Sequence, residues 1–259
     1  MVINSINALG LYTQKVVYRC GVFTLFLHES VRSFLEHGVN TGKLLVQINY
    51  IGVNSLVVIM TTGLSVGAVL AMQTHIGLSR FGAFQFIGPV VFLGMVREFG
   101  PILSSIMVAG RAGSAMTAEI GTMQITEQID ALRTLGLNVK QYLIVPRIVA
   151  STISMPLISL FCSLCGILGG YIVAVGVLKV NHEIYISSIQ ENVVVNDILH
   201  GLVKSIVFGF LVGSIATFKG YQTRGGAREV GNSTTQSVVS ASLATLIADY
   251  ILVSIAKAL

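Results

Sequence analysis

The sequence predicts an all-α integral membrane protein: an amphipathic helix at the N-terminus that lies in the membrane interface, followed by five transmembrane helices. The 259 residues are 53% hydrophobic and only 10% charged, and their mean hydropathy is +0.81. Soluble domains carry roughly a quarter charged residues. Charge is costly in hydrocarbon and is depleted from membrane spans, so this composition indicates a multi-span protein.

The N-terminal segment Ser5–Leu35 is apolar but interrupted by charge, at Lys15, Arg19, Glu29 and Arg32 among others. It is too interrupted to span, and it lacks the order of a signal peptide. We expect an amphipathic helix that lies in the membrane interface.

Five later blocks are long enough for the roughly 20 apolar residues that a span needs. They are Ile48–Met72, Phe84–Ala118, Tyr142–Leu178, Ile198–Phe218 and Val238–Ala258. No linker or internal repeat separates them, so we expect a single domain over 1–259, with an interfacial region 1–45 and a transmembrane region 46–259. Secondary transporters are often built from two related halves, which five unequal spans do not provide.

The second block is too long for one straight span and holds Arg97, Glu98, Gly100 and Pro101 near its middle. Proline removes a backbone donor and kinks a helix. We expect a broken or tilted element here, with a re-entrant segment as one form of it. Such backbone survives at membrane depth only where protein or a cavity covers it.

Lysine and arginine predict the orientation, because cytoplasmic loops are enriched in them. The N-terminal segment and the loops after the second and fourth spans are the basic ones. Their residues are Lys15, Arg19, Arg32, Lys43, Arg111, Arg133, Lys140, Arg147, Lys219, Arg224 and Arg228. The N-terminus is therefore expected in the cytoplasm and the C-terminus on the other side. The net charge of +5 fits this topology. Since the basic residues are scattered, no nucleic-acid partner is expected.

The cytoplasmic connection within Gly110–Arg147 predicts a short helix of about ten residues, or about 15 Å. Thr126 is the expected N-cap, Asp130 lies in the first turn, and Gly136 follows the end. Ile129 and Leu132 share one face. Connections are usually roughly 4–6 residues long, so this longer one is interpreted as a docking element rather than as an ordinary connector.

Four charged residues lie inside or near apolar blocks: Arg97, Glu98, Lys204 and Asp249. Intramembrane charges usually face the protein interior or a wet cavity and mark a pathway. The other interpretation is a structural ion pair, Arg97 with Asp249 or Glu98 with Lys204. Both interpretations can hold together.

Several familiar site patterns are absent. The run from Gly38 to Lys43 has only three residues between its glycines and lacks the Ser or Thr of a phosphate loop. Cys162 and Cys165 lie in an apolar run without a second ligand pair, so no metal site is expected. No catalytic residue is predicted. The motifs Gly63-x-x-x-Gly67 and Gly209-x-x-x-Gly213 favour close helix packing, with dimerisation as one form of it.

The run Arg97–Asn138 (REFGPILSSIMVAGRAGSAMTAEIGTMQITEQIDALRTLGLN) closely resembles the signature of the MlaE/YrbE family of ABC-transporter permeases. VPR at 145–147, GLVKSIVFG at 201–209, GGAREVGNSTTQSVV at 225–239 and the Asp249 span are similar to it as well. The resemblance covers nearly the whole chain. It implies a permease of the bacterial inner membrane that moves phospholipids between the inner and outer membranes and is not itself an enzyme.

The resemblance also implies partners. These are a second copy of the chain, a cytoplasmic ABC ATPase subunit, a periplasmic MCE-domain protein and, in some systems, a STAS-domain protein. ATP and Mg would bind to the ATPase, and no cofactor to this chain. The resemblance implies that the short helix predicted between Thr126 and Gly136 is the cytoplasmic coupling helix between spans two and three. The residues expected to couple to the ATPase are Glu119, Thr126, Glu127, Gln128, Asp130, Leu132 and Arg133.

The resemblance implies that Glu98, Lys204 and Asp249 line the lipid cavity of the family, with Arg97 beside them, and that these four are pathway or gating residues. Lys204 is the expected head-group contact, because cations pair strongly with phosphate. The loop Thr74–Phe86 matches no family motif. An ATP-independent channel or secondary transporter is the alternative function, and a structural membrane anchor is a third.

Overall fold

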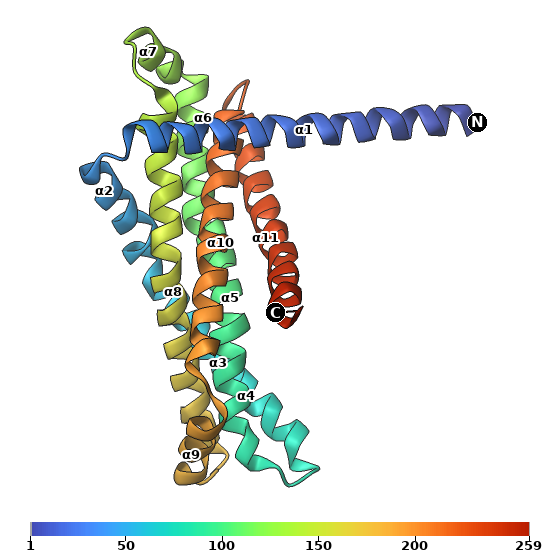
Figure 1. The fold of residues 1–259 in the computed structure, drawn as a ribbon, viewed down its shortest axis with the longest axis vertical. Coiled ribbons are helices and arrows are strands. Elements are labelled where there is room, and N and C mark those ends of the chain that lie inside the picture. The colour runs from blue at the N-terminus through green and yellow to red at the C-terminus, as the bar shows by residue number, and fades with distance from the viewer. Residues whose placement is uncertain (1, 259) are drawn as a thin grey trace.

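The computed structural model describes the backbone of residues 2–258, and the side chains of this range apart from 2–12, 15, 16, 37 and 258. The chain is helical throughout the described elements, as predicted (Figure 1). The α-helices are α1 (Val2–His37), α2 (Thr41–Ile51), α3 (Leu56–Ser79), α4 (Ile87–Leu93), α5 (Gly100–Val108), α6 (Ser114–Ile125), α7 (Gln128–Thr134), α8 (Val145–Tyr171), α9 (His182–Asn192), α10 (Val195–Tyr221) and α11 (Ala227–Ala258).

Within the described range, five helical stretches are long and apolar enough to cross a membrane, which confirms the predicted number. They are Thr41–Ser79, Phe84–Ile125, Lys140–Val177, Val195–Tyr221 and Ala227–Lys257. The first and last begin earlier than predicted. Asn40 caps α2 by accepting a hydrogen bond from the Lys43 amide, and the glycine-rich stretch after residue 226 is already helical.

Helix α1 crosses one end of the bundle at a steep angle to the spans and is not one of them (Figure 1). Phe26 anchors it, because its ring packs edge-on against Phe218 at 5.3 Å. Asn138 adds a hydrogen bond to Ser33, at 3.3 Å. The helix is confirmed, and its place in the membrane interface stays a prediction.

The second span is interrupted twice without turning back. The π-helical segments η3 (Gly94–Phe99) and η4 (Ala109–Gly113) join α4, α5 and α6 into one run. The expected break therefore lies at η3, and Pro101 follows directly after it in the first turn of α5. A re-entrant segment is wrong. π-bulges leave backbone groups unpaired and cluster at functional sites.

Both small-residue motifs pack within the chain. A Cβ on Gly67 would meet the Gly166 carbonyl oxygen at 1.8 Å, so α3 and α8 cross with their backbones nearly touching. A Cβ on Gly209 would meet the Ser151 carbonyl oxygen at 2.6 Å, where α10 crosses α8. Close packing is confirmed, and these faces are not free for a second copy.

Helix α9, between the third and fourth spans, was not predicted. Asn181 caps it by accepting hydrogen bonds from the Glu183 and Ile184 amides at 2.8 and 3.4 Å. Tyr185 fixes it to the bundle, because its side chain is buried in a cluster with Val91. Burial raises the pKa of Tyr185 to about 12.

The molecule thus has two distinct ends. Helices α1 and α7 and the α10–α11 turn lie at one end, and α9 and the α3–α4 turn lie at the other (Figure 1). We call these the α7 end and the α9 end. The segments predicted to be cytoplasmic all fall at the α7 end.

Candidate functional site

Toward the α9 end, a buried ion network joins three spans. Its members are Lys204 of α10, Glu98 of η3 and Asp249 of α11. The Lys204 Nζ lies 2.5 Å from Glu98 Oε2 and 2.9 Å from Asp249 Oδ1, and the lysine is only 5% exposed. The Asp249 contact lacks hydrogen-bond geometry and is an ion pair only. The predicted Glu98–Lys204 pair is confirmed.

The π-helical segment η3 makes this network possible. Lys204 Nζ donates a third contact to the Arg97 carbonyl oxygen at 3.1 Å, so the ammonium uses a backbone group at the bulge. Ser163 similarly donates to the Met95 carbonyl oxygen at 3.1 Å. Helix α10 can approach η3 closely because residue 201 is a glycine: a Cβ at this position would meet the Val96 carbonyl oxygen at 2.2 Å.

The predicted pairing of Arg97 with Asp249 is wrong. Arg97 Nη1 instead pairs with Asp197 Oδ1 at 3.1 Å, since Asp249 is held by Lys204. Asp197 also accepts a hydrogen bond from the Val194 amide at the start of α10. Sequence reasoning missed Asp197, which carries only the signal of a helix-start carboxylate. The Arg97 side chain remains 42% exposed.

A cavity of about 310 Å³ opens beside the network. Its apolar walls come from Leu199, Val203 and the end of α11, and its polar lining is Arg97, Glu98, Asn196, His200 and Lys204. The structure thus brings three of the four predicted pathway residues to one cavity and ties the fourth, Asp249, to them. A cavity of this kind accepts an amphiphile with a charged end.

At the α7 end, the predicted short helix is present but begins differently. Thr126 is not its N-cap: the Thr126 hydroxyl donates back to the Thr122 carbonyl at 2.8 Å and ends α6. Glu127 follows in the left-handed conformation, with φ of 59°, and turns the chain into α7. Such a conformation is unfavourable for a residue with a side chain, so the surrounding helices hold it.

The end of α7 is as predicted. Gly136 has a φ of 75°, and its amide and that of Leu137 donate to the Arg133 and Leu132 carbonyls. This is the Schellman arrangement, in which glycine takes the left-handed position.

Helix α7 is fixed on one face and exposed on the other. Ile129 is fully buried and Leu132 packs beside it. Arg133 donates to the Tyr221 hydroxyl at 2.5 Å and to Asp130 at 2.7 Å, and the contact with Tyr221 raises the pKa of the Arg133 guanidinium. Among the residues predicted to couple to the ATPase, the exposed ones on and just before α7 are Thr126, Glu127, Gln128, Asp130 and Arg133.

Glu119 lies away from this surface, on α6. Its carboxylate pairs with Arg147 Nη2 of α8 at 2.8 Å. Arg147 is 5% exposed and also donates to the Leu143 carbonyl at 2.7 Å. Glu119 therefore braces α6 against α8 rather than lying on the exposed side of α7.

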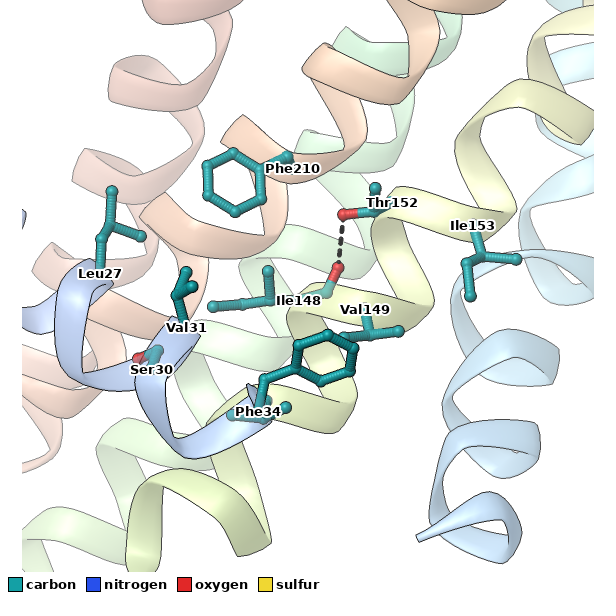
Figure 2. A pocket seen from close by; sticks show the side chains of 10 residues that line it. Leu27, Ser30, Val31, Phe34, Ile148, Val149, Thr152, Ile153 and Phe210 are labelled. Atoms are coloured by element: carbon teal, nitrogen blue, oxygen red, sulfur yellow. Dashed lines mark hydrogen bonds between the residues drawn. The ribbon is translucent and has the colours of Figure 1, made fainter. Parts of the chain in front are cut away.

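A second cavity, of about 280 Å³, lies between α1, α8 and α10 (Figure 2). Leu27, Val31 and Phe34 of α1 face Ile148 and other residues of α8 across it, and Phe210 closes one side. Its two hydroxyl groups already donate to backbone carbonyls, Thr152 to Ile148 and Ser30 to Phe26, and the rest of the lining is apolar. This cavity suits a hydrocarbon chain.

Comparison with known proteins identifies the family. A family model described as Permease MlaE matches residues 44–255. The chain belongs to the MlaE permease family. It is similar to a probable ABC transporter permease protein of Rickettsia typhi, with 39% identity over 252 residues and 97% of each chain covered.

Two further relatives widen the range of the family. The intermembrane phospholipid transport system permease protein MlaE of Haemophilus influenzae is 36% identical, with 98% of each chain covered. The chloroplastic protein TRIGALACTOSYLDIACYLGLYCEROL 1 of Arabidopsis thaliana is 35% identical, over 93% of this chain and 69% of the plant protein. The resemblance predicted from the run Arg97–Asn138 is therefore confirmed, and this MlaE-type permease is a multi-pass membrane protein.

Proposed function

We propose that this chain is the transmembrane permease subunit of an ABC transporter that moves phospholipids between the inner and outer membranes. The observation that carries the proposal is the similarity along 98% of both chains to a permease named for intermembrane phospholipid transport. ATP and Mg bind to a separate ATPase subunit. This chain provides the route and the surface on which the ATPase acts, and it is not itself an enzyme.

The ATPase docks on the exposed side of α7, at Glu127, Gln128 and Asp130. Ile129 and Leu132 hold the helix to the bundle from the other side. A push on α7 reaches α10 through the hydrogen bond between Arg133 and Tyr221. It reaches α6 directly, because α7 follows α6 after a single tight turn.

The buried ion network acts as a gate. Lys204 ties η3, α10 and α11 together, so α11 cannot leave α10 without separating Lys204 from Asp249. Lys204 already contacts three acceptors and is buried, which disfavours it as the head-group contact. Arg97 is the better phosphate ligand, because it lines the cavity, is 42% exposed, and its guanidinium matches phosphate geometry.

The resemblance to the family supports the remaining partners that we propose, and the charge distribution supports the orientation. A second copy of the chain completes the transporter, an MCE-domain protein receives lipid at the α9 end, and a STAS-domain protein accompanies the ATPase in some systems. The α7 end lies in the cytoplasm, because the basic segments gather there. The N-terminus is then cytoplasmic, the C-terminus periplasmic, and the membrane is the bacterial inner membrane.

Reconstitution tests this function. The chain is placed in liposomes with its ATPase and a fluorescent phospholipid, and transfer to an acceptor is followed. We expect transfer that requires ATP, with none from the ATPase in liposomes without this chain. Transfer by this chain alone under an ion gradient would favour the channel or secondary-transporter alternative instead.

Photo-cross-linking tests the route. Photoreactive residues replace Val203 and Leu252, which line the cavity beside the network, and Leu168, which is exposed on α8 outside it. We expect phospholipid adducts at 203 and 252 whose yield changes with ATP, and an ATP-independent yield at 168. Equal, ATP-independent yields at all three positions would contradict the route.

A further inference from the structure

A third cavity lies at the α7 end, and we propose that it binds the anionic, phosphate-bearing head group of a phospholipid from the leaflet at that end. It has a volume of about 560 Å³. Helices α1, α6, α7 and α10, the segment η5 (Lys140–Ile144) and the α10–α11 turn surround it. None of the pathway or gating residues lines it. The choice of leaflet rests on the proposed orientation.

The charge of the lining favours an anion. Arg133, Lys140 and Arg224 line the cavity with one carboxylate, Glu29, and Asp130 pairs with Arg133 beside it, so three cations against two carboxylates leave one positive charge. Lys140 pairs with Glu29. Arg133 donates to Asp130 and to Tyr221. Arg224 makes no hydrogen bond or ion pair with the described part of the chain, and a phosphate would supply that partner.

The other wall of the cavity is apolar. Val22, Leu25 and Phe26 of α1 face Phe218 across it, and Leu25 is 63% exposed. The basic cavity therefore has both polar and apolar areas, in contrast to the largely apolar cavity between α1, α8 and α10 (Figure 2). An amphiphile satisfies both walls, with its phosphate at the arginines and its glycerol and first methylenes along α1.

The position of α1 supports a lipid rather than a soluble anion. Its residues at 18, 22, 25, 26 and 29 line the basic cavity, and those at 27, 30, 31 and 34 line the apolar one. At 100° per residue these sets lie on roughly opposite faces of the helix. The apolar cavity then faces hydrocarbon and the basic cavity faces the head-group layer, which is where an interfacial helix lies.

A head group held there would connect α7, through Arg133, with the α10–α11 turn, through Arg224. It would thereby hold the docking helix in place. The site would make the position of α7 depend on the lipid present at its own end of the bundle, far from the ion network.

Ligand-dependent stability tests the proposal on the full chain alone in neutral detergent. Thermal unfolding is measured with short-chain phosphatidylglycerol, short-chain phosphatidylcholine, inorganic phosphate, or sodium chloride of equal ionic strength. A ligand that binds only the folded state stabilises it by RT ln(1 + [L]/Kd), so Tm rises with the concentration of the ligand. We expect a rise with phosphatidylglycerol that exceeds the other three, and slower amide exchange in α7 when it is bound.

Two arginine variants make the test specific. Arg224→Gln should weaken the phosphatidylglycerol effect about tenfold in concentration, while Arg228→Gln should leave it unchanged, because Arg228 does not line the cavity. An equal effect of phosphatidylglycerol on the Arg224→Gln variant would overturn the site. An equal rise with inorganic phosphate would overturn the lipid as its ligand and assign the site to a free phosphate compound.

These outcomes are separate from the transport assay, because the ATPase is absent. The leaflet is tested separately through Cys20, which is exposed on α1. A membrane-impermeant maleimide applied to intact cells should not label it. Labelling from outside would overturn the orientation, and with it the leaflet, while the stability test would still decide the site.

Discussion

The two ends of this permease use charge in opposite ways. In the buried ion network, Lys204 is 5% exposed and its ammonium contacts Glu98, Asp249 and a backbone carbonyl. On α7, Glu127 and Asp130 are exposed, and Asp130 pairs only with its neighbour Arg133. The first group is satisfied within the chain, whereas the second is left for a partner.

Because of this difference, mutations in the two groups should change different properties of the protein. A buried pair that loses one member leaves an uncompensated charge at a cost of about 3–5 kcal/mol, whereas an exposed pair contributes about 0–1 kcal/mol. Variants of the network should therefore affect folding before function. Variants of α7 should affect association and leave folding intact.

The largest effect is expected for Lys204→Met. It leaves Glu98 and Asp249 facing each other without a cation, so the free energy of unfolding should fall by about 3–5 kcal/mol. Thermal or denaturant unfolding in detergent measures this. The triple variant with Glu98→Gln and Asp249→Asn should recover most of the loss, because no unpaired charge then remains. Wild-type stability of Lys204→Met alone would mean that the three groups are not coupled.

A backbone variant at the same place should have the next largest effect. The Cβ of Gly201→Ala would meet the Val96 carbonyl oxygen at 2.2 Å, so α10 must move away from η3. Overpacking of this kind costs about 1–3 kcal/mol. The matched control is Gly231→Ala in α11, where an added Cβ meets nothing within 4 Å. If both variants unfold alike, the close contact between α10 and η3 is not what holds the network.

The buried ion network shows how much of the site could be predicted from the sequence. Intramembrane charge is rare enough that Arg97, Glu98, Lys204 and Asp249 stand out, and the pair Glu98–Lys204 is confirmed. The partner of Arg97 could not be predicted. The π-helical turn rotates Arg97 toward Asp197, and neither composition nor periodicity signals a π-bulge.

At the α7 end, the sequence predicted the helix and its glycine stop but not its start. Threonine is a residue type that favours the N-cap, yet Thr126 is the C-terminal cap of α6, and a left-handed Glu127 makes the turn. Propensity gives no reason to expect glutamate at such a position, because tertiary packing holds it there. Helix α9 was missed for a related reason: its sequence is short and polar, and tertiary contacts such as those of the buried Tyr185 hold it to the bundle.

Charge reversal on α7 should weaken association without unfolding. Glu127→Lys with Asp130→Lys places two cations where the ATPase is proposed to dock. We expect association with the ATPase to weaken about tenfold or more, which corresponds to about 1.4 kcal/mol, with unchanged Tm. Co-purification and titration in detergent measure it. Glu191→Lys, an exposed carboxylate variant at the α9 end, is the control. Full retention of the ATPase by the double variant would remove α7 from the docking surface.

The smallest effects compare the two left-handed residues that bracket α7. Gly136→Ala puts a side chain at a φ of 75° and should destabilise by about 1 kcal/mol, whereas Glu127→Gly relieves the same conformation at a φ of 59°. The relief should offset the entropy that glycine adds to the unfolded chain, so Glu127→Gly should leave Tm within error or raise it.

Measuring ATP hydrolysis by the complex distinguishes the roles of the two residues. Glu127→Gly removes a carboxylate and lets the turn sample other conformations, so lipid-dependent ATP hydrolysis by the complex should fall even though the chain is no less stable. Gly136→Ala should lower stability and leave hydrolysis per folded complex nearly unchanged. If both variants changed hydrolysis only in proportion to the folded fraction, the left-handed turn at Glu127 would be a structural feature of the α6–α7 connection and not part of the coupling.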